Sequence, residues 1–211
     1  MSDKMPSRGF QGAVLKLLRA GDDQLTVTGR RELIPHYLRL SVDAGGLLTV
    51  DPNPDADTVD IEFALHDGVA SGWAQDARPG DTIEVTVLGS NFTPPEPAPN
   101  GLVIVDDTAT LPAINSLLTV IGDTPARVIL EAGHDDDTQL AVAQSAHVVW
   151  VHRKKGGEAL VQAVSASAFD AADHLGWVAC DNRTTPEVAK VFREDYKIPR
   201  KSIKAQAYWV A

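Results

Sequence analysis

A proline-rich segment near the middle of the chain separates two different patterns of secondary structure. Residues 93–100 read TPPEPAPN, and the four prolines in this window are incompatible with a helix and with the interior of a sheet. Before the segment, short alternating strands are joined by turns; after it, buried strands alternate with helices. The chain is therefore expected to form two units, residues 1–93 and 101–211, joined by an extended linker over residues 94–100.

The first unit has the pattern of a small antiparallel β-barrel. Its expected strands are short runs rich in branched and aromatic residues, bounded by turn residues. They cover residues 12–18, 25–28, 37–42, 59–65 and 82–88.

The second unit has the pattern of a Rossmann-like α/β domain, with a mostly parallel sheet and helices on its faces. The expected strands cover residues 102–105, 127–132, 147–151, 177–180 and 202–208. The expected helices cover residues 111–121 and 157–165, and a third helix begins at 184. Thr185 is the expected N-cap of the last helix, with Pro186 at its first position. No G-x-G-x-x-G motif follows Val105, so a glycine-rich phosphate loop is not expected there.

The stretch from residue 59 to 92 combines two strands with one helical turn between them. The first strand ends at His66, and the helical turn over residues 70–74 is too short to be a core helix. The free N–H groups at the start of such a turn can bind an anion such as phosphate. Residues 79–81 (PGD) then turn the chain into the second strand. This stretch predicts an anion site on the first unit.

Five segments in a fixed order resemble the siderophore-interacting proteins, which are flavin-dependent ferric-siderophore reductases of the ferredoxin-reductase-like superfamily. The residues that carry the resemblance are His66, Gly68, Ala70, Ser71, Trp73, Ala74 and the PGD of 79–81, then DDTATLPAI at 106–114, WVHR at 150–153, WVA at 177–179 and KAQAYW at 204–209. Together they cover most of the chain from about residue 32 onward, and five motifs in order are more specific than any one of them.

The resemblance implies an FAD-binding barrel domain followed by an NAD(P)H-binding α/β domain. Electrons would pass from NAD(P)H through FAD to iron(III) in a siderophore, as part of iron acquisition. The resemblance implies flavin or pyrophosphate contacts for His66, Ala70, Ser71, Gly72 and Trp73, nicotinamide contacts for Thr108 and Thr110, and phosphate or chelate contacts for Arg153, Lys154, Lys155 and Lys204. It assigns no catalytic side chain and no resident metal site.

The chain departs from this family in the segment before His66. The family carries an Arg-x-Tyr-Ser/Thr motif there, whose arginine and tyrosine hold the flavin. Residues 47–50 (LLTV) stand in its place, without the arginine or the tyrosine, and the interval between Val42 and Asp57 is too short for the family's additional strand. The phosphate half of a flavin site is therefore expected to be present, and the ring half is expected to be lost.

Several of these residues also have plain structural interpretations. Thr108 or Thr110 would cap the next helix, with Asp106 and Asp107 adding favourable charge at its start. Trp73 would anchor the short helix in the core, and Cys180 would be a small core residue. The same alternative holds for the remaining candidates: His66 and residues 152–155 would be solvated strand ends, and His134 with residues 135–137 would be a solvated turn and not a site for a hard metal ion.

Composition excludes several classes of partner. The formal net charge is −10, which opposes binding to nucleic acid and to an anionic membrane surface. The single cysteine excludes an internal disulfide, and no apolar run approaches the roughly 20 residues that span a bilayer. The polar start of the sequence lacks a signal-peptide core, so the chain is expected to be cytoplasmic. A barrel that lacks a strand exposes an edge, which the N-terminal segment or a second copy of the chain in a homodimer would cover.

Two functional hypotheses follow. In the first, the chain is an FAD-dependent, NAD(P)H-using ferric-siderophore reductase. In the second, it is a catalytically silent relative without flavin that acts as a siderophore-binding, regulatory or assembly protein. The retained segments around His66 and Thr108 favour the first, and the missing Arg-x-Tyr-Ser/Thr motif favours the second.

Overall fold

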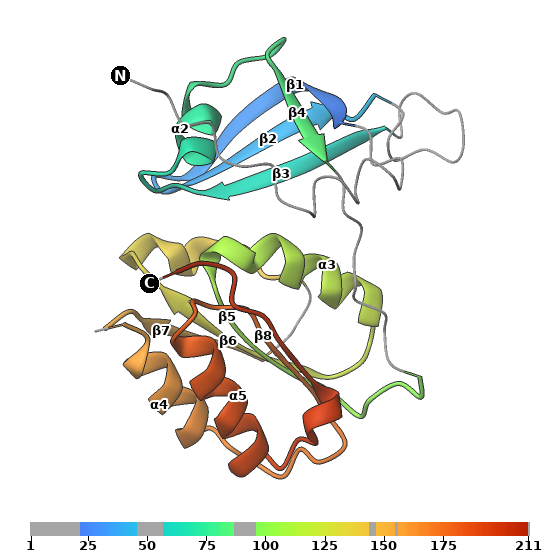
Figure 1. Cartoon of the computed structure of the whole chain (residues 1–211), viewed down its shortest axis with the longest axis vertical. Helices are drawn as coiled ribbons and strands as arrows, with labels where there is room; N and C mark the ends of the chain where they lie inside the picture. Colours follow the sequence, from blue (N-terminus) through green and yellow to red (C-terminus); the bar gives the residue numbers. More distant parts are fainter. Residues whose placement is uncertain (1–21, 46–56, 87–95, 144–146, 155, 211) are drawn as a thin grey trace, which may run out of the picture.

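The chain forms an antiparallel sheet followed by a parallel sheet, which confirms the predicted fold class (Figure 1). The computed structural model describes residues 22–45, 57–86, 96–143, 147–154 and 156–210. In Figure 1 the antiparallel sheet, coloured blue to green, lies above the parallel sheet, coloured green to red. The strand predicted at 12–18, the segment 47–50 and Lys155 lie outside the described residues. The division of the chain at residues 94–100 stays a prediction.

Four strands form the N-terminal sheet in the order β3-β2-β1-β4, and each neighbouring pair is antiparallel. They are β1 (Asp22–Ile34), β2 (Tyr37–Asp43), β3 (Thr58–Ala64) and β4 (Thr82–Thr86). Within the described residues this sheet is an open half-barrel with β3 and β4 at its edges.

Alternate side chains of β2 point to one face of the sheet and form the core of this half-barrel. Leu38, Leu40 and Val42 are fully buried, and the residues between them project to the opposite face. Helix α2 (Val69–Asp76) covers the buried face and places Ala74 in the same core. The predicted turn of helix is therefore a helix of eight residues.

Strand β1 is much longer than the predicted strand at 25–28. Its second half contains exposed polar residues such as Arg30 and Glu32, which do not give the hydrophobic alternation of a strand. The segment is extended because it pairs with β2 in a hairpin, with irregularities in register between Val27 and Gly29 and between Glu32 and Ile34.

The C-terminal sheet has the strand order β7-β6-β5-β8-β9 and is parallel throughout. Its strands are β5 (Leu102–Asp107), β6 (Ala126–Ala132), β7 (His147–His152), β8 (Leu175–Val178) and β9 (Ile203–Ala205). Every residue of the central strand β5 is buried, as expected for a strand that is covered on both faces.

Helices cover both faces of this parallel sheet. Helix α3 (Leu111–Ile121) packs with the Leu102 and Ile104 side of β5, while α4 (Glu158–Ala166) and α5 (Thr184–Glu194) pack with the Val103 and Val105 side. Figure 1 accordingly shows α3 between the two sheets and α4 and α5 beneath the lower one. Short 3-10 turns complete the elements, η2 (Thr108–Thr110), η3 (Asp135–Gln139) and η4 (Arg200–Ser202).

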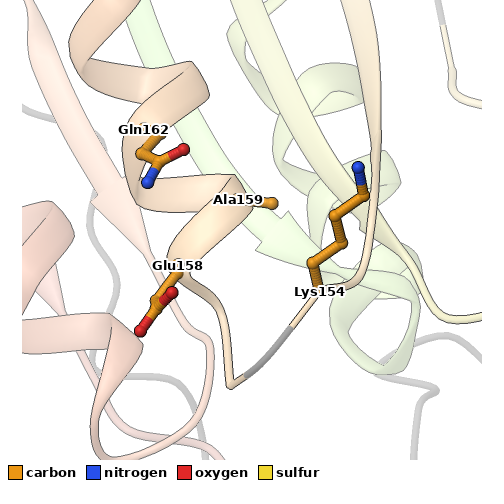
Figure 2. A pocket seen from close by; sticks show the side chains of 4 residues that line it. All are labelled: Lys154, Glu158, Ala159 and Gln162. Atoms are coloured by element: carbon orange, nitrogen blue, oxygen red, sulfur yellow. The ribbon is translucent and has the colours of Figure 1, made fainter.

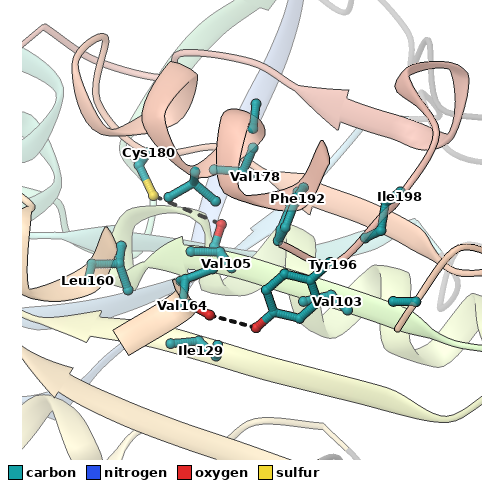
Figure 3. Packing of buried hydrophobic residues seen from close by; sticks show 13 residues of the cluster. Val103, Val105, Ile129, Leu160, Val164, Val178, Cys180, Phe192, Tyr196 and Ile198 are labelled. Carbon is teal, nitrogen blue, oxygen red and sulfur yellow. Dashed lines mark hydrogen bonds between the residues drawn. The ribbon is translucent and has the colours of Figure 1, made fainter. Parts of the chain in front are cut away.

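The core on the α4 and α5 side joins these two helices to β5, β6 and β8, and it includes Tyr196 (Figure 3). The Tyr196 hydroxyl donates a hydrogen bond to the Val164 carbonyl at 2.8 Å, and burial raises the pKa of this tyrosine to about 12. Cys180 belongs to the same cluster, where its Sγ lies 3.9 Å from the Val105 carbonyl oxygen. Burial raises the pKa of this thiol, so Cys180 is a protonated core residue at neutral pH.

The last two strands differ from their predicted bounds. The strand predicted at 177–180 is β8 (Leu175–Val178), and the strand predicted at 202–208 is limited to β9 (Ile203–Ala205). Only Gly176, Trp177 and Val178 pair with β9, so the ladder ends after three residues. The chain nevertheless continues along the sheet, because Trp209 forms a parallel bridge with Asp181.

The hairpin between β1 and β2 joins the two sheets. Ile34 and Tyr37, at its end, belong to the core that α3 forms on the parallel sheet. The Tyr37 hydroxyl donates to the Thr108 carbonyl at 3.1 Å, and the His36 ring stacks on His134 with 3.8 Å between centroids. Side chains of the hairpin therefore fix the first sheet directly against the carboxyl edge of the second.

Gly157→Ala is expected to lower the free energy of unfolding by roughly 3 kcal/mol. Gly157 has a φ of +84°, and an added Cβ would overlap the Thr184 side chain at the start of α5. Gly156→Ala is the matched control: its φ is +60°, but its Cβ would meet no described atom within 4 Å, so a loss of about 1 kcal/mol is expected. Urea denaturation of both variants measures the difference, and equal losses would contradict the proposed contact between Gly157 and Thr184.

Candidate functional site

Acidic side chains from three strands meet at the carboxyl edge of the parallel sheet. Asp106 and Asp107 end β5, Glu131 lies near the end of β6, and Asp181 follows β8; all four are buried. Because β5, β6 and β8 are parallel, their carboxyl ends lie at one edge. Ligands bind at this edge in open α/β sheets, so the acidic cluster lies where a nucleotide is expected.

Asp106 lies fully buried at the centre of the cluster. Its carboxyl group accepts hydrogen bonds from the Trp177 indole at 3.2 Å and from the Asp107 backbone at 3.3 Å. Burial raises the pKa of Asp106 to about 8, because desolvation outweighs the hydrogen bonds from Thr110, Asp107 and Trp177. Asp106 is therefore mostly protonated at neutral pH.

Asp107 connects three separate segments of the chain. Its carboxylate accepts hydrogen bonds from the Ala109 backbone at 2.9 Å and from the Trp209 indole at 2.8 Å, and it lies 3.7 Å from Nη2 of Arg153. Burial raises the pKa of Asp107, and the hydrogen bond from Trp209 is the main opposing effect. Asp107 thus fixes the η2 turn and the C-terminal Trp209 relative to each other.

The interpretation that Thr108 or Thr110 caps the next helix through its side chain is corrected by the structure. The Asp107 side chain caps η2, while Thr110 occupies the N-cap position of α3 without capping through its side chain. The Thr110 hydroxyl instead donates to the Asp107 carbonyl at 3.2 Å. A carboxylate binds the free N–H more strongly than a hydroxyl does, because the hydrogen bond is charge-assisted.

Glu131 and Arg153 form a short ion pair in which one glutamate oxygen is left over. Arg153 donates from Nε to Oε2 of Glu131 at 2.6 Å, and its guanidinium lies 5.4 Å from the centre of the Trp209 ring. Oε1 of Glu131 is buried and has no hydrogen-bond partner among the described residues. Burial raises the pKa of Glu131 and is opposed by the bond from Arg153. The unpartnered oxygen is an acceptor that a bound ligand can satisfy.

Asp181 caps helix α5. Its carboxylate accepts hydrogen bonds from the backbone N–H groups of Arg183 and Thr184, at 2.7 and 3.0 Å, and from the Thr184 hydroxyl. Burial acts to raise the pKa of Asp181, but these bonds outweigh it and the pKa is lowered. The prediction of Thr185 as the N-cap is therefore wrong: Thr185 lies inside the first turn, and its buried hydroxyl has no partner among the described residues.

The predicted basic residues that the structure describes are dispersed, and of these only Arg153 joins the acidic cluster. Lys154 lines a separate hollow of about 500 Å³ with Glu158, Ala159 and Gln162 (Figure 2). In Figure 2, Ala159 projects from α4 toward the Lys154 side of this hollow. Lys204 lies exposed on the edge strand β9. These lysines can meet an anion that approaches from solvent, whereas Arg153 is already paired.

The predicted anion site on the first unit is an open helix start. Gly68 is the N-cap of α2 and makes no side-chain capping bond, and the first helical bond runs from the Gly72 N–H to the Gly68 carbonyl. Val69 is 93% exposed, and an added Cβ at Gly72 would meet no described atom within 4 Å. The N–H groups at this end are therefore accessible to a phosphate.

The other residues predicted around α2 hold the helix in place. The buried Ser71 hydroxyl accepts a hydrogen bond from the His66 backbone at 2.9 Å, and an added Cβ at Gly68 would overlap the His66 ring. Trp73 is half-buried against Phe63, with 6.3 Å between ring centroids. The Ser71 hydroxyl therefore holds the first turn of α2 against the segment around His66.

The structure brings Thr108, Thr110 and Arg153 to one edge of the parallel sheet and keeps the α2 residues on the other sheet. The sequence analysis did not identify Glu131, Asp181 or Trp209 as parts of one cluster. A signal was available for Glu131, because an acidic residue directly follows the apolar run at 128–130. Its pairing with Arg153 depends on the strand order, which the sequence does not state.

Three features test whether the described residues fit FAD and a nicotinamide nucleotide. The open start of α2 fits a pyrophosphate, and the unpartnered Glu131 oxygen at the sheet edge fits a hydrogen-bond donor such as a ribose hydroxyl. Within the same described ranges, no group of three or more His, Cys, Asp or Glu residues is arranged to hold a metal ion. The described residues therefore fit the pyrophosphate of FAD and a ribose hydroxyl of the nicotinamide nucleotide.

A half-barrel antiparallel sheet followed by a five-stranded parallel sheet is also the fold of the solved ferredoxin reductase in carbazole 1,9a-dioxygenase, which superposes with a TM-score of 0.66 at 16% identity, covering 89% of this chain and 69% of that one. Family models match two parts of the chain: "Siderophore-interacting FAD-binding domain" over residues 26–89 and "Siderophore-interacting protein" over residues 98–211. The second match covers more than half of the chain. The chain belongs to the siderophore-interacting protein family.

Two curated relatives and a second solved structure are similar to this chain. The mycobactin import ATP-binding/permease protein IrtA of Mycolicibacterium thermoresistibile is 31% identical over 240 residues, covering 96% of this chain and 26% of the relative. The NADPH-dependent ferric-chelate reductase of Escherichia coli is 26% identical over 157 residues, covering 72% of this chain and 60% of the relative. The siderophore-interacting protein SipS of Aeromonas hydrophila superposes with a TM-score of 0.74 at 20% identity, covering 90% of this chain and 92% of that one.

The relatives differ from this chain in length. The chain spans about a quarter of the IrtA relative. The alignment of 240 residues is longer than the whole 211-residue chain, so the matched part of that relative contains segments with no counterpart here. No described helix is long and apolar enough to cross a membrane.

Proposed function

We propose that this chain transfers electrons from NAD(P)H through FAD to iron(III) bound by a siderophore. The observation that carries the proposal is the open N-terminus of α2, which lies inside the segment matched by the family's FAD-binding domain. The ferric-chelate reductase of E. coli supports the same reaction class. Bound flavin supplies the conversion between hydride transfer and single-electron transfer.

The chain's own residues bind and orient the groups at two places. The N–H groups at the start of α2 hold the flavin pyrophosphate, with His66 and Trp73 beside it. At the sheet edge, the η2 turn positions the nicotinamide near Thr108 and Thr110, and Asp106 holds a buried proton next to this turn. Arg153 orients the ribose side of the nucleotide, while Lys154 and Lys204 attract the anionic chelate.

The second candidate is a silent family member that binds siderophore without flavin. It is supported by the missing Arg-x-Tyr-Ser/Thr motif and by the internal segments that the IrtA relative has in addition. The visible spectrum of the purified protein, before and after FAD titration, separates the two. A flavin band that bleaches with NAD(P)H supports the reductase; a colourless protein that binds no FAD supports the silent relative.

The proposed reaction places the chain in the cytoplasm, where reduced nicotinamide nucleotides are made. We also propose a homodimer in which a second copy covers an edge of the half-barrel. Light scattering measures the mass in solution, and a monomer of 22.6 kDa would reject the dimer.

Val69→Asp is expected to weaken FAD binding at least tenfold. The new carboxylate would occupy the first turn of α2, where it stabilises the helix and repels the pyrophosphate. Val69 is 93% exposed, so the fold should be unaffected. FAD titration followed by absorbance measures the change in affinity.

The isosteric neutral variant Val69→Asn controls for the change of side chain without the charge. It should bind FAD within about threefold of wild type, and both variants should melt at the wild-type temperature. Equal affinity of Val69→Asp and wild type would remove the start of α2 from the flavin site.

A further inference from the structure

We propose that the nucleotide site of this chain selects NADH over NADPH, and that Glu131 is the residue that determines this selectivity. The inference rests on the proposed function and names the hydride donor of that site. The two nucleotides differ only at one ribose hydroxyl, which carries a phosphate in NADPH. The selectivity is therefore decided by the charges and hydrogen-bond groups that meet this position.

The geometry of Arg153 makes it a poor phosphate ligand. An arginine near the carboxyl edge is the group that accommodates the extra phosphate in NADP-binding folds. Here the Arg153 backbone N–H donates to the Ala132 carbonyl at 2.7 Å, which places its side chain beside Glu131. The guanidinium then donates to Oε2 of Glu131 at 2.6 Å and lies 3.7 Å from Asp107. A phosphate would have to replace both carboxylates.

The charge balance around Arg153 opposes a second anion. One guanidinium faces three carboxyl groups, those of Glu131, Asp107 and Asp181, and all three act electrostatically on it. Removing Arg153 from Glu131 would leave a buried carboxylate without its counter-ion, which is unfavourable in a site of low dielectric. Binding of NADPH would carry this penalty, and its ribose phosphate would also be repelled by the carboxylates of Asp107 and Asp181. Binding of NADH, which has no such phosphate, would carry neither cost.

Glu131 also provides a positive reason to bind the free hydroxyl. The residue lies one position before the end of β6, the second strand of the parallel sheet in chain order. An acidic residue at the end of this strand accepts a ribose hydroxyl in dinucleotide-binding folds. Its side chain is 5% exposed, and Oε1 has no partner within the described part of the chain. Arg153 is 40% exposed, so the exposed end of its guanidinium can move to admit the hydroxyl while Nε stays paired with Oε2. The hydroxyl then donates a hydrogen bond to Oε1, whereas a phosphate dianion has no proton to donate.

Lys154 does not replace Arg153 as a phosphate ligand. It faces the separate hollow beside α4, where the carboxylate of Glu158 is also present. The described groups that a ribose phosphate would meet at the sheet edge are therefore predominantly acidic. The preference for NADH therefore has two causes: the acidic groups repel the phosphate of NADPH, and Glu131 accepts a hydrogen bond from the ribose hydroxyl of NADH.

The test compares the binding of NADH and NADPH to the full chain by calorimetry and by quenching of tryptophan fluorescence, with FAD added. Wild type should bind NADH at least tenfold more tightly than NADPH. Glu131→Gln keeps the shape of the side chain and an acceptor for Arg153, but removes the charge that neutralises the guanidinium. It should weaken NADH binding, strengthen NADPH binding and shift the affinity ratio at least tenfold.

Glu158→Gln is the matched control, because it removes one negative charge from an exposed position next to Lys154. It should leave the NADH to NADPH ratio within about twofold of wild type. An equal shift in both variants would assign the effect to net charge and overturn the role of Glu131. Thermal melting of each variant confirms that it is folded.

The outcomes separate this inference from the proposed function. Comparable binding of the two nucleotides to wild type, or a ratio that Glu131→Gln leaves unchanged, overturns the inference while the reductase stands. Failure to bind FAD with selective binding of NADH supports the inference and removes the flavin step. Absence of binding by both nucleotides overturns the inference together with the hydride donor of the proposed reaction.

Discussion

Tyr37→Ala should lower the free energy of unfolding by about 4 kcal/mol, one of the two largest effects we expect from a single substitution in this chain. Tyr37 is 1% exposed and lies in the hydrophobic core between α3 and the parallel sheet, although it belongs to the antiparallel sheet. Removal of its ring leaves a cavity where the two sheets meet, and removal of its hydroxyl frees the carbonyl of Thr108.

Tyr37→Phe separates these two contributions. It keeps the ring and removes the hydroxyl, with its hydrogen bond to Thr108 and its interaction with Glu62, so a loss of about 1 kcal/mol is expected. Tyr208→Ala is a control for loss of a tyrosine at a position that is 61% exposed, and it should change stability by less than about 0.5 kcal/mol. Chemical denaturation measures all three.

Tyr37→Ala should also change whether the two sheets unfold together. In wild type, the hairpin residues Ile34 and Tyr37 contribute to the core of the second sheet, so both sheets should unfold in one transition. In Tyr37→Ala the antiparallel sheet should unfold first, which tryptophan fluorescence and circular dichroism would detect as separate midpoints. Coincident midpoints with an unchanged free energy would show that Tyr37 does not hold the sheets together.

The sequence was sufficient to predict the elements whose patterns are local. Helix α3 has the predicted bounds of 111–121, because its apolar spacing and its early proline both belong to the helix itself. Strand β5 was predicted from a continuous apolar run, and it is extended by Asp106 and Asp107 because β6 pairs with both of them. A prediction from hydrophobic residues alone ends the strand before Asp106, because the two aspartates that continue it are polar.

The candidate site was predicted only in part, because its contacts join distant segments. Trp209 and Asp107 are 102 residues apart in sequence and share a hydrogen bond. Arg153 was identified as a free cation for phosphate or chelate, and in the structure it is paired with Glu131. Its charge was evident from the sequence, but its partner depends on β6 and β7 being neighbours in the sheet.

Asp106→Asn should stabilise the chain by about 5 kcal/mol at pH 8 and have little effect near pH 4. The pKa of Asp106 is raised from 3.8 to about 8 by burial in the folded chain. Between these two values the unfolded chain has released the proton and the folded chain still holds it. The stability that Asp106 contributes is therefore complete below pH 4 and is lost as the pH rises to 8, by at most about 1.4 kcal/mol per pH unit.

The amide of Asp106→Asn cannot ionise, so the variant should not show this loss, and its carbonyl oxygen can still accept the hydrogen bond from the Trp177 indole. Urea denaturation of wild type and variant from pH 4 to 8 measures the difference at each pH. Asp76→Asn, on the exposed end of α2, controls for the removal of one negative charge. A difference between wild type and Asp106→Asn that stays constant across this range would mean that Asp106 is ionised in the folded chain. The carboxyl edge would then carry another negative charge, which would strengthen its repulsion of a phosphorylated nucleotide.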